Sequence, residues 1–232
     1  MTAELLPDEY FIQPFDGQHA IYLSIFLVIL FLILRLHKKI RQNPEPLLRG
    51  TLIVSVLQVL LLYASYIAEG FNWAEGLPLH ISRVSTFIGI FWMLTRKPIF
   101  MDILFFFGIY AYGSFLYPSR IHPITHPIGW SFLINHVVTI LLPLIAVIAY
   151  DWRPTLRAYW RSVLCFLIYL AAAMVTNELV NGNYFYMTKR IVLQDIPLWQ
   201  YTIFIIFFTL ILFALFGWAA HQLIKAFQRR AA

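Results

Sequence analysis

Apolar residues along this chain are gathered into long blocks separated by short polar joints. The blocks cover residues 18–36, 47–68, 78–95, 98–116, 130–150, 161–180 and 198–223. Most of them approach the twenty or so residues that an α-helix needs to cross a hydrocarbon layer about 30 Å thick. The pattern therefore predicts an all-α, polytopic membrane bundle with seven transmembrane helices.

The joints between the blocks are rich in proline, glycine, asparagine and charged residues. The longest non-apolar stretch between two blocks is 181–200. No internal repeat or soluble domain interrupts the pattern. We therefore divide the chain into an outer N-terminal segment, 1–17, a transmembrane domain, 18–225, and a basic cytoplasmic tail, 226–232.

Basic residues are distributed unequally between the two sides that alternating helices would create. With the N-terminus outside, the inner side holds Arg35, Lys38, Lys39, Arg41, Arg49, Arg96, Lys97, Arg153, Arg157, Arg161, Lys225, Arg229 and Arg230. The outer side then holds only Arg120, Lys189 and Arg190. Because cytoplasmic loops carry an excess of Lys and Arg, we expect an outside N-terminus and a cytoplasmic C-terminus.

Composition supports the membrane prediction and excludes other classes. Hydrophobic residues make up 61% of the chain and charged residues 12%, whereas a soluble domain carries about a quarter charged residues. The net charge of +6 comes from basic residues at block ends, so it does not predict a nucleic-acid partner. Cys165 is the single cysteine, which excludes a disulfide framework. Acids precede the first block and bases follow it, so we expect no cleavable signal peptide.

Polar and ionisable side chains inside the blocks gather near the predicted outer ends. They are His80, Ser82 and Arg83 in the third block, Tyr112 in the fourth, Asn135 and His136 in the fifth, Asn177 and Glu178 in the sixth, and Asn183 just after it. Ionisable groups within hydrocarbon are costly and indicate function. Their common depth predicts one polar site that opens toward the outer leaflet.

Two of these residues fit a base and a nucleophile. A neutral His136 could take a proton from a hydroxyl, and Ser82 enters from the same side at a similar depth. Either residue could instead hold helices together, His136 by a hydrogen bond and Ser82 at a close contact. Arg83 could pair with Glu178, or it could bind a lipid phosphate or carboxylate.

His122 and His126 have the spacing of a zinc pair on a helix. The string reads His122-Pro-Ile-Thr-His126-Pro, and its prolines argue against a regular helical turn. No carboxylate lies close in sequence to complete a site. We therefore expect neither a metal nor another cofactor.

Four strings carry a family resemblance: 77–82 (LPLHIS), 110–118 (YAYGSFLYP), 130–137 (WSFLINHV) and 181–185 (NGNYF). Their order and spacing across roughly 20–220 resemble the bacterial YwaF-like branch of the transmembrane protein 164 family. The resemblance implies a multi-helix acyltransferase acting on lipid. The animal member is described as moving a fatty acyl chain onto an ether lysophospholipid through a cysteine and a histidine.

The resemblance assigns roles to particular residues. His136 matches the family's histidine, and Leu79 stands where the family has its cysteine. Many bacterial relatives carry a cysteine at the position of Ser82, which makes this serine the tentative nucleophile. The acyltransferase hypothesis, and not the resemblance, adds His80 to the candidate catalytic set, where it would bind the acyl carbonyl or phosphate together with Arg83. The same hypothesis gives the expected substrate-binding residues as Arg83, Asn135, Asn177, Glu178, Asn183 and Tyr112.

The leading hypothesis is thus a membrane acyltransferase, or a related lipid-processing enzyme, in a bacterial inner membrane. Its partner would be a membrane lipid such as a lysophospholipid or an acyl donor; no protein partner is indicated. The alternatives are a non-catalytic membrane protein or a small-solute permease that uses the same recess for binding. A zinc-dependent lipid amidase would need three convergent histidines.

Overall fold

The computed structural model describes residues 10–190 and 192–231, and this part of the chain is helical. The elements are α1 (Gly17–Arg35), α2 (His37–Gln42), α3 (Glu45–Glu69), α4 (Trp73–Gly76), α5 (Ile81–Thr95), α6 (Pro98–Phe107), α7 (Ile109–Leu116), α8 (Pro127–Tyr150), α9 (Leu156–Val180), the 3-10 turn η3 (Tyr184–Tyr186) and α10 (Leu198–Ala231). One isolated bridge, Ile12 with Ile121, is the β-type pairing within these residues. The all-α prediction is confirmed there. Most of the predicted outer segment, 1–9, and the last residue of the tail, 232, lie outside the described residues.

Six helical stretches in the described part of the chain are long and apolar enough to cross a membrane. They are Gly17–Arg35, Glu45–Glu69, Pro98–Leu116, Pro127–Tyr150, Leu156–Val180 and Leu198–Ala226. The third predicted block forms the shorter apolar helix α5, whose 15 residues extend about 22 Å. It is short because Leu77 and His80 adopt extended backbone before the first helical turn.

Capping residues explain where several helices begin. The carboxylate of Asp16 accepts a hydrogen bond from the His19 amide at the start of α1, and the Thr155 hydroxyl accepts one from the Ala158 amide at the start of α9. At α8, Pro127 occupies the first turn and the His126 ring accepts the Ile128 amide. Proline and a side-chain acceptor are both favoured at a helix start, where amides lack partners.

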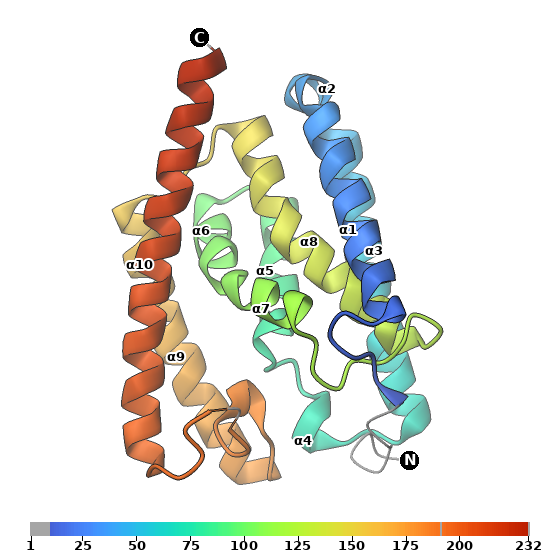
Figure 1. The fold of residues 1–232 in the computed structure, drawn as a ribbon, viewed down its shortest axis with the longest axis vertical. Helices are drawn as coiled ribbons and strands as arrows, with labels where there is room; N and C mark the ends of the chain where they lie inside the picture. Colours follow the sequence, from blue (N-terminus) through green and yellow to red (C-terminus); the bar gives the residue numbers. More distant parts are fainter. Residues whose placement is uncertain (1–9, 191, 232) are drawn as a thin grey trace.

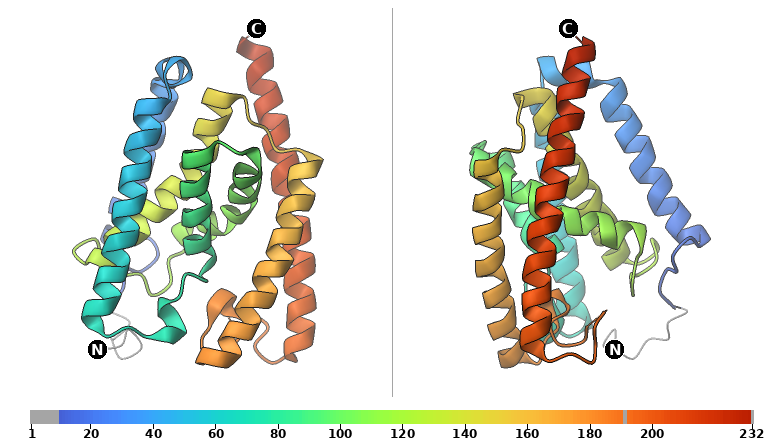
Figure 2. Two further views of the ribbon diagram at one scale, coloured as in Figure 1. Left: turned by 180° about the vertical axis from the view of Figure 1, so that it is seen from behind. Right: turned by 60° about the vertical axis from the view of Figure 1, so that its left-hand side comes forward.

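Helix α8 crosses the middle of the bundle and carries much of its core (Figures 1 and 2). It packs against α1, α2 and α3 on one side and against α5, α6 and α7 on the other. On the far side α6 packs against α9 and α10. The most apolar window of α8 is 61% buried, compared with 17% in α1 and 11% in α10, so α8 is internal and the outer helices present apolar surface to lipid.

A glycine at the junction of α6 and α7 allows close packing on α8. A Cβ at Gly108 would lie 2.8 Å from the Leu104 carbonyl oxygen and 3.3 Å from the Thr139 side chain. The absence of a side chain leaves room for this contact with α8 at the point where α6 ends and α7 begins.

Candidate functional site

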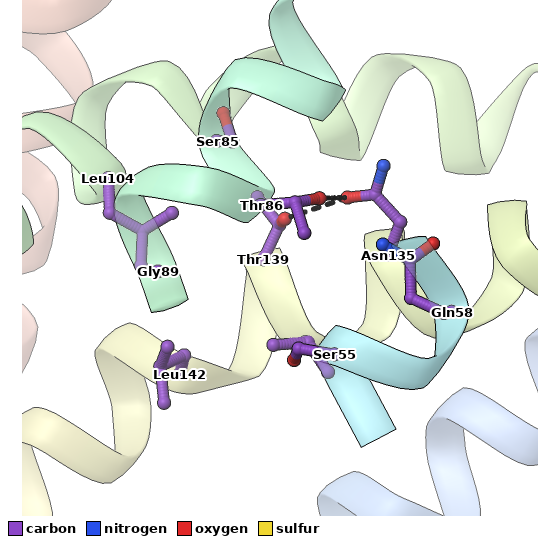
Figure 3. Close-up of a pocket in the computed structure, with 10 residues that line it drawn as sticks. Ser55, Gln58, Ser85, Thr86, Gly89, Leu104, Asn135, Thr139 and Leu142 are labelled. Carbon is purple, nitrogen blue, oxygen red and sulfur yellow. Dashed lines mark hydrogen bonds between the residues drawn. The ribbon is translucent and has the colours of Figure 1, made fainter. Parts of the chain in front are cut away.

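Side-chain hydrogen bonds join three helices deep in the bundle. The Thr86 hydroxyl on α5 donates to Asn135 Oδ1 on α8 at 2.8 Å, and the Thr139 hydroxyl donates to the same oxygen at 3.2 Å (Figure 3). The Ser131 hydroxyl on α8 donates to Gln58 Oε1 on α3 at 2.6 Å. We call these five residues the polar seam. It ties α3 and α5 to α8 inside the bundle.

A small cavity adjoins the polar seam. Its walls are Ser55, Gln58, Ser85, Thr86, Gly89, Leu104, Asn135, Val138, Thr139 and Leu142 (Figure 3). The volume of about 10 Å³ is close to the lower limit for one water molecule. Ser55 and Ser85 donate to backbone carbonyls of their own helices rather than across the cavity. The cavity suits a water and not an acyl chain.

His136 lies on α8 next to the polar seam but faces other neighbours. Its side chain is buried, and Nδ1 lies 2.8 Å from the Phe132 carbonyl oxygen one turn earlier. The centre of the His136 imidazole ring lies 3.8 Å from the centre of the Phe132 ring. It lies 6.2 Å from the centre of the Phe115 ring of α7, on which it stacks. If Nδ1 carries the proton and donates to this carbonyl, Nε2 keeps its lone pair and can accept a proton.

Ser82 lies on α5, one turn before the polar seam. Its carbonyl accepts a hydrogen bond from Thr86 at 3.1 Å, and its side chain is partly exposed. Among the described residues, no hydrogen bond joins the hydroxyl of Ser82 to His136. Ser82 lies on α5 and His136 on α8, and the structure does not bring their side chains together as a bonded pair.

Arg83 is held by groups near the start of α5. Its guanidinium donates to the carbonyl oxygens of Glu75 at 2.5 Å and Leu77 at 3.0 Å, and to the Tyr66 hydroxyl. It also lies 5.0 Å from the centre of the Tyr66 ring. The ion pairs of the described chain do not include the expected one between Arg83 and Glu178. Backbone carbonyls take the place of that carboxylate.

Asn177 and His80 both contact the buried Tyr184, at the end of the bundle where α5 begins. The Asn177 amide donates to the Tyr184 carbonyl at 3.0 Å and accepts the Tyr184 amide at 2.7 Å. The Tyr184 hydroxyl donates to the Trp73 carbonyl and accepts the Leu77 amide. The His80 ring lies edge-on to Tyr184 at 4.9 Å. This cluster connects α9, η3 and α4.

The remaining predicted residues lie apart from these groups. Asn183 accepts the amides of Thr188 and Lys189 and thereby shapes the loop after η3. Tyr112 packs on Phe216 of α10 at 5.6 Å, and Glu178 is exposed. The predicted residues therefore form several local groups rather than one recess. The sequence indicates the position of each residue along its helix, but neighbouring positions point about 100° apart and face different helices.

Sequence reasoning overlooked Gln58 and Thr139, which complete the polar seam. Gln58 is 2% exposed and lies within α3, the second of the long helices, which is otherwise mainly apolar. A buried amide within an apolar span was the available signal, because such groups need a partner in lipid. Thr139 follows Asn135 by four residues, the spacing that places both on one helical face.

His122 and His126 lie in the loop before α8, stacked 4.4 Å apart. His126 Nε2 is 3.5 Å from a Glu69 carboxylate oxygen. Burial, with His126 and Arg120 nearby, lowers the pKa of His122 to about 4. No group of three His, Cys, Asp or Glu residues that could hold a metal occurs in the described ranges. The segment is non-helical, as its prolines predict.

Comparison with known proteins identifies the family. A family model described as the TMEM164 family matches residues 14–219. The chain belongs to the TMEM164 family. An uncharacterized protein of Treponema pallidum (strain Nichols) is 26% identical over 170 residues, covering 72% of this chain and 68% of that protein. No solved structure matches.

Family membership and the apolar helices together establish an integral membrane protein. The TMEM164-family match includes α1 to α9 and most of α10, and so covers all the site residues discussed above. The resemblance expected from the four strings is confirmed at the level of the family. Within this TMEM164 bundle, His136 is a buried imidazole whose Nδ1 contacts the Phe132 carbonyl oxygen, and it follows Asn135 of the polar seam along α8.

Proposed function

We propose that this protein is a membrane-embedded acyltransferase, or a closely related lipid-processing enzyme. Its substrate would be a membrane lipid, such as a lysophospholipid or an acyl donor, and its site would face the outer leaflet of a bacterial inner membrane. The observation that supports this best is His136, a buried imidazole with Nδ1 occupied by a backbone carbonyl of its own helix. That arrangement favours the tautomer a general base requires.

In the proposed reaction Ser82 is the nucleophile. Its hydroxyl oxygen attacks the acyl carbonyl of the donor, and its proton passes to His136 Nε2. The tetrahedral intermediate collapses, the donor's alcohol leaves with that proton, and an acceptor hydroxyl then takes the acyl group from Ser82 by the reverse steps. Catalytic hydrogen bonds often form only in the substrate complex, so the proposal requires α5 and α8 to bring these groups together.

Asn135 is the best supported donor for the developing oxyanion. Its Oδ1 accepts two hydroxyls, from Thr86 and Thr139, which fixes the side chain. The amide nitrogen is turned away from both threonines (Figure 3). An amide held in place by other contacts is the kind of preorganised donor that stabilises negative charge in a transition state. We propose His80, Arg83, Glu178, Asn183 and Tyr112 as outer groups near the lipid headgroup, and Asn177, whose amide is bonded to the Tyr184 backbone, as a residue that positions this end of the bundle.

The proposal includes seven spans, with α5 as the short seventh, an outside N-terminus and a cytoplasmic C-terminus. Figure 1 places α2, the end of α8 and the end of α10 at one end of the bundle and α4 at the other. Lys38, Lys39 and Arg41 belong to α2, and Arg96 follows α5. This grouping supports a cytoplasmic position for that end by the positive-inside rule.

The decisive experiment measures acyl exchange between defined lipids in vesicles containing the purified protein. His136→Gln should lower turnover by about 10²-fold or more, the contribution of general acid–base catalysis. Ser82→Ala should abolish exchange. Ser85→Ala is the matched control, because Ser85 lies on the same helix and donates only to the Ile81 carbonyl. Unchanged turnover in His136→Gln would remove the proposed base.

A second variant separates the nucleophile from the base. Ser82→Cys supplies a thiol, which is a stronger nucleophile than a hydroxyl. If Ser82 accepts the acyl group, Ser82→Cys should retain exchange and form a thioester that hydroxylamine cleaves. Ser85→Cys should form none. Exchange that persists in Ser82→Ala would show that another group is the nucleophile.

A non-catalytic membrane protein is the second candidate. The observation in its favour is that Arg83 and Asn177 already have backbone partners within the protein. Normal complementation of a deletion strain by the Ser82→Ala, His136→Ala double variant would favour this function. A small-solute permease has less support, because the cavity beside the polar seam is about 10 Å³ and could not pass a solute.

A further inference from the structure

A second, larger cavity lies between α8 and the helices that precede α4. It measures about 410 Å³, within the roughly 300–1,000 Å³ usual for small-molecule sites. Its walls come from α1, α2, the first turns of α3 and the middle of α8, and they include Leu32, Leu36, Lys39, Asn43, Leu141 and Ile145. Figure 1 shows α8 running obliquely to α1 across this region, toward the end that carries α2. We call this cavity the α1–α8 groove.

The walls of the α1–α8 groove are apolar except at one end. Leu141 and Ile145 of α8 are buried along its inner wall, while Leu32 is 47% and Leu36 is 41% exposed at its rim. An opening of this kind in a membrane-spanning bundle faces lipid chains and not water. An acyl chain in the groove would supply the dispersion contacts that the lining side chains otherwise lack.

The polar end of the groove carries positive charge. Lys39 and Asn43 line it, and both are exposed. The nearby acids are already paired: Asp151 lies 2.8 Å from Arg41, and Glu45 lies 3.2 Å from Arg96. The described ion pairs do not include Lys39. The mouth of the groove therefore has a cation that no described carboxylate neutralises.

We propose that the α1–α8 groove binds an anionic phospholipid, with one acyl chain along α8 and the phosphate at Lys39 and Asn43. A basic site between membrane helices on the cytoplasmic side is the arrangement that recognises anionic headgroups, and it rests here on the proposed orientation. This lipid is bound and not transformed. Its phosphate would lie at the end of the bundle opposite Arg83 and Tyr184, while Val138 and Leu142 of α8 line both this groove and the cavity beside the polar seam.

Lipid retention tests the proposal. The full-length protein is reconstituted in vesicles of equal phosphatidylglycerol and phosphatidylcholine, extracted in mild detergent, and examined by native mass spectrometry. The wild type should retain phosphatidylglycerol in preference. Lys39→Glu should lower that retention several-fold, while Lys38→Glu, an exposed neighbour that does not line the groove, should not.

A second pair of variants tests the acyl chain. Leu32→Trp should fill the groove and lower retention of both lipids, whereas Leu34→Trp, at a similarly exposed position outside the groove, should leave retention unchanged. Equal phosphatidylglycerol retention by Lys39→Glu and the wild type would overturn the proposal. Full retention by Leu32→Trp would also overturn it, because the lipid would then bind the basic surface without entering. Since the readout is bound lipid, failed acyl exchange would leave this result unaffected.

Discussion

Asn177 holds the backbone of Tyr184 through both ends of its side-chain amide. Nδ2 donates to the Tyr184 carbonyl at 3.0 Å, and Oδ1 accepts the Tyr184 amide at 2.7 Å. Tyr184 is fully buried, and its hydroxyl in turn donates to the Trp73 carbonyl at 2.8 Å. The end of α9, the turn η3 and the segment at α4 are thereby joined through one asparagine, which gives Asn177 a structural role.

Asn177→Ala should therefore destabilise the fold. The substitution leaves two buried backbone groups of Tyr184 without partners, and each such loss costs about 1–3 kcal/mol. The midpoint of thermal unfolding in detergent should fall clearly. Glu178→Ala changes the adjacent, exposed side chain and should leave the midpoint nearly unchanged. An Asn177→Ala protein that unfolds like the wild type would contradict this role.

The positions of the membrane helices were largely predictable from the apolar blocks. The block 18–36 became α1, and 98–116 became α6 and α7 with a break at Gly108. Helix α9 begins at Leu156, before the predicted 161, because Thr155 caps a polar first turn that hydropathy alone does not detect. The third block was shortened at its start, where the backbone is extended.

The site was less predictable, because its geometry depends on which way each side chain faces. Asn135 and His136 are adjacent in sequence, yet one joins the polar seam and the other packs on Phe115. For Arg83 the sequence left two partners open, Glu178 or a lipid phosphate or carboxylate, whereas in the structure its guanidinium donates to the carbonyls of Glu75 and Leu77. Every residue has a backbone carbonyl, so the sequence does not indicate which carbonyls will accept a hydrogen bond from a given side chain.

A buried ion pair between α6 and α9 gives a prediction by double substitution. Asp102 is 5% exposed, and its carboxylate accepts Arg161 at 2.9 Å and the Trp152 indole at 3.1 Å. Asp102→Leu alone leaves Arg161 unpaired; because the Arg161 side chain is 33% exposed, the cost should be about 3 kcal/mol or less, below that of a fully buried charge. Adding Arg161→Met should recover most of that loss, because no charge is then left without a partner.

The exposed pair between Arg41 and Asp151 is the control for this prediction. Their side chains are 59% and 53% exposed, and such pairs contribute only about 0–1 kcal/mol. Asp151→Asn should therefore change the denaturation midpoint little; the backbone there is left-handed, a conformation that asparagine tolerates. If the Asp102→Leu, Arg161→Met protein is no more stable than Asp102→Leu, unpaired charge is not the cause of the loss.

His122 should make the fold less stable in mild acid. Burial, with His126 and Arg120, lowers its pKa from 6.5 to about 4, and its Nδ1 has no described hydrogen-bond partner. Below pH 6.5 the unfolded chain binds a proton at this ring that the folded protein does not accept until the pH nears 4. Stability contributed by the neutral ring is therefore full at higher pH and decreases as the pH falls through this range.

The measurement compares thermal midpoints at about pH 7.5 and about pH 5. The difference between the two midpoints should be smaller in His122→Gln than in the wild type. His37→Gln, at the other end of the bundle (Figure 1), should preserve the wild-type difference. If the difference between the two midpoints is as large in His122→Gln as in the wild type, another group causes the acid sensitivity.

The contact between Thr86 and Asn135 gives the last prediction, a coupling energy within the membrane. Hydrogen bonds between membrane helices couple by about 0.6 kcal/mol on average and at most about 1.7 kcal/mol. The cycle formed by Thr86→Val, Asn135→Ala and the double variant should give a value in this range, measured by denaturation in detergent. Thr95→Val is the control, because Thr95 lies about 13 Å further along α5 and donates to the Phe91 carbonyl. Its effect should simply add to that of Asn135→Ala, and equal coupling in the two cycles would show that Asn135 acts on α5 through general packing and not through Thr86.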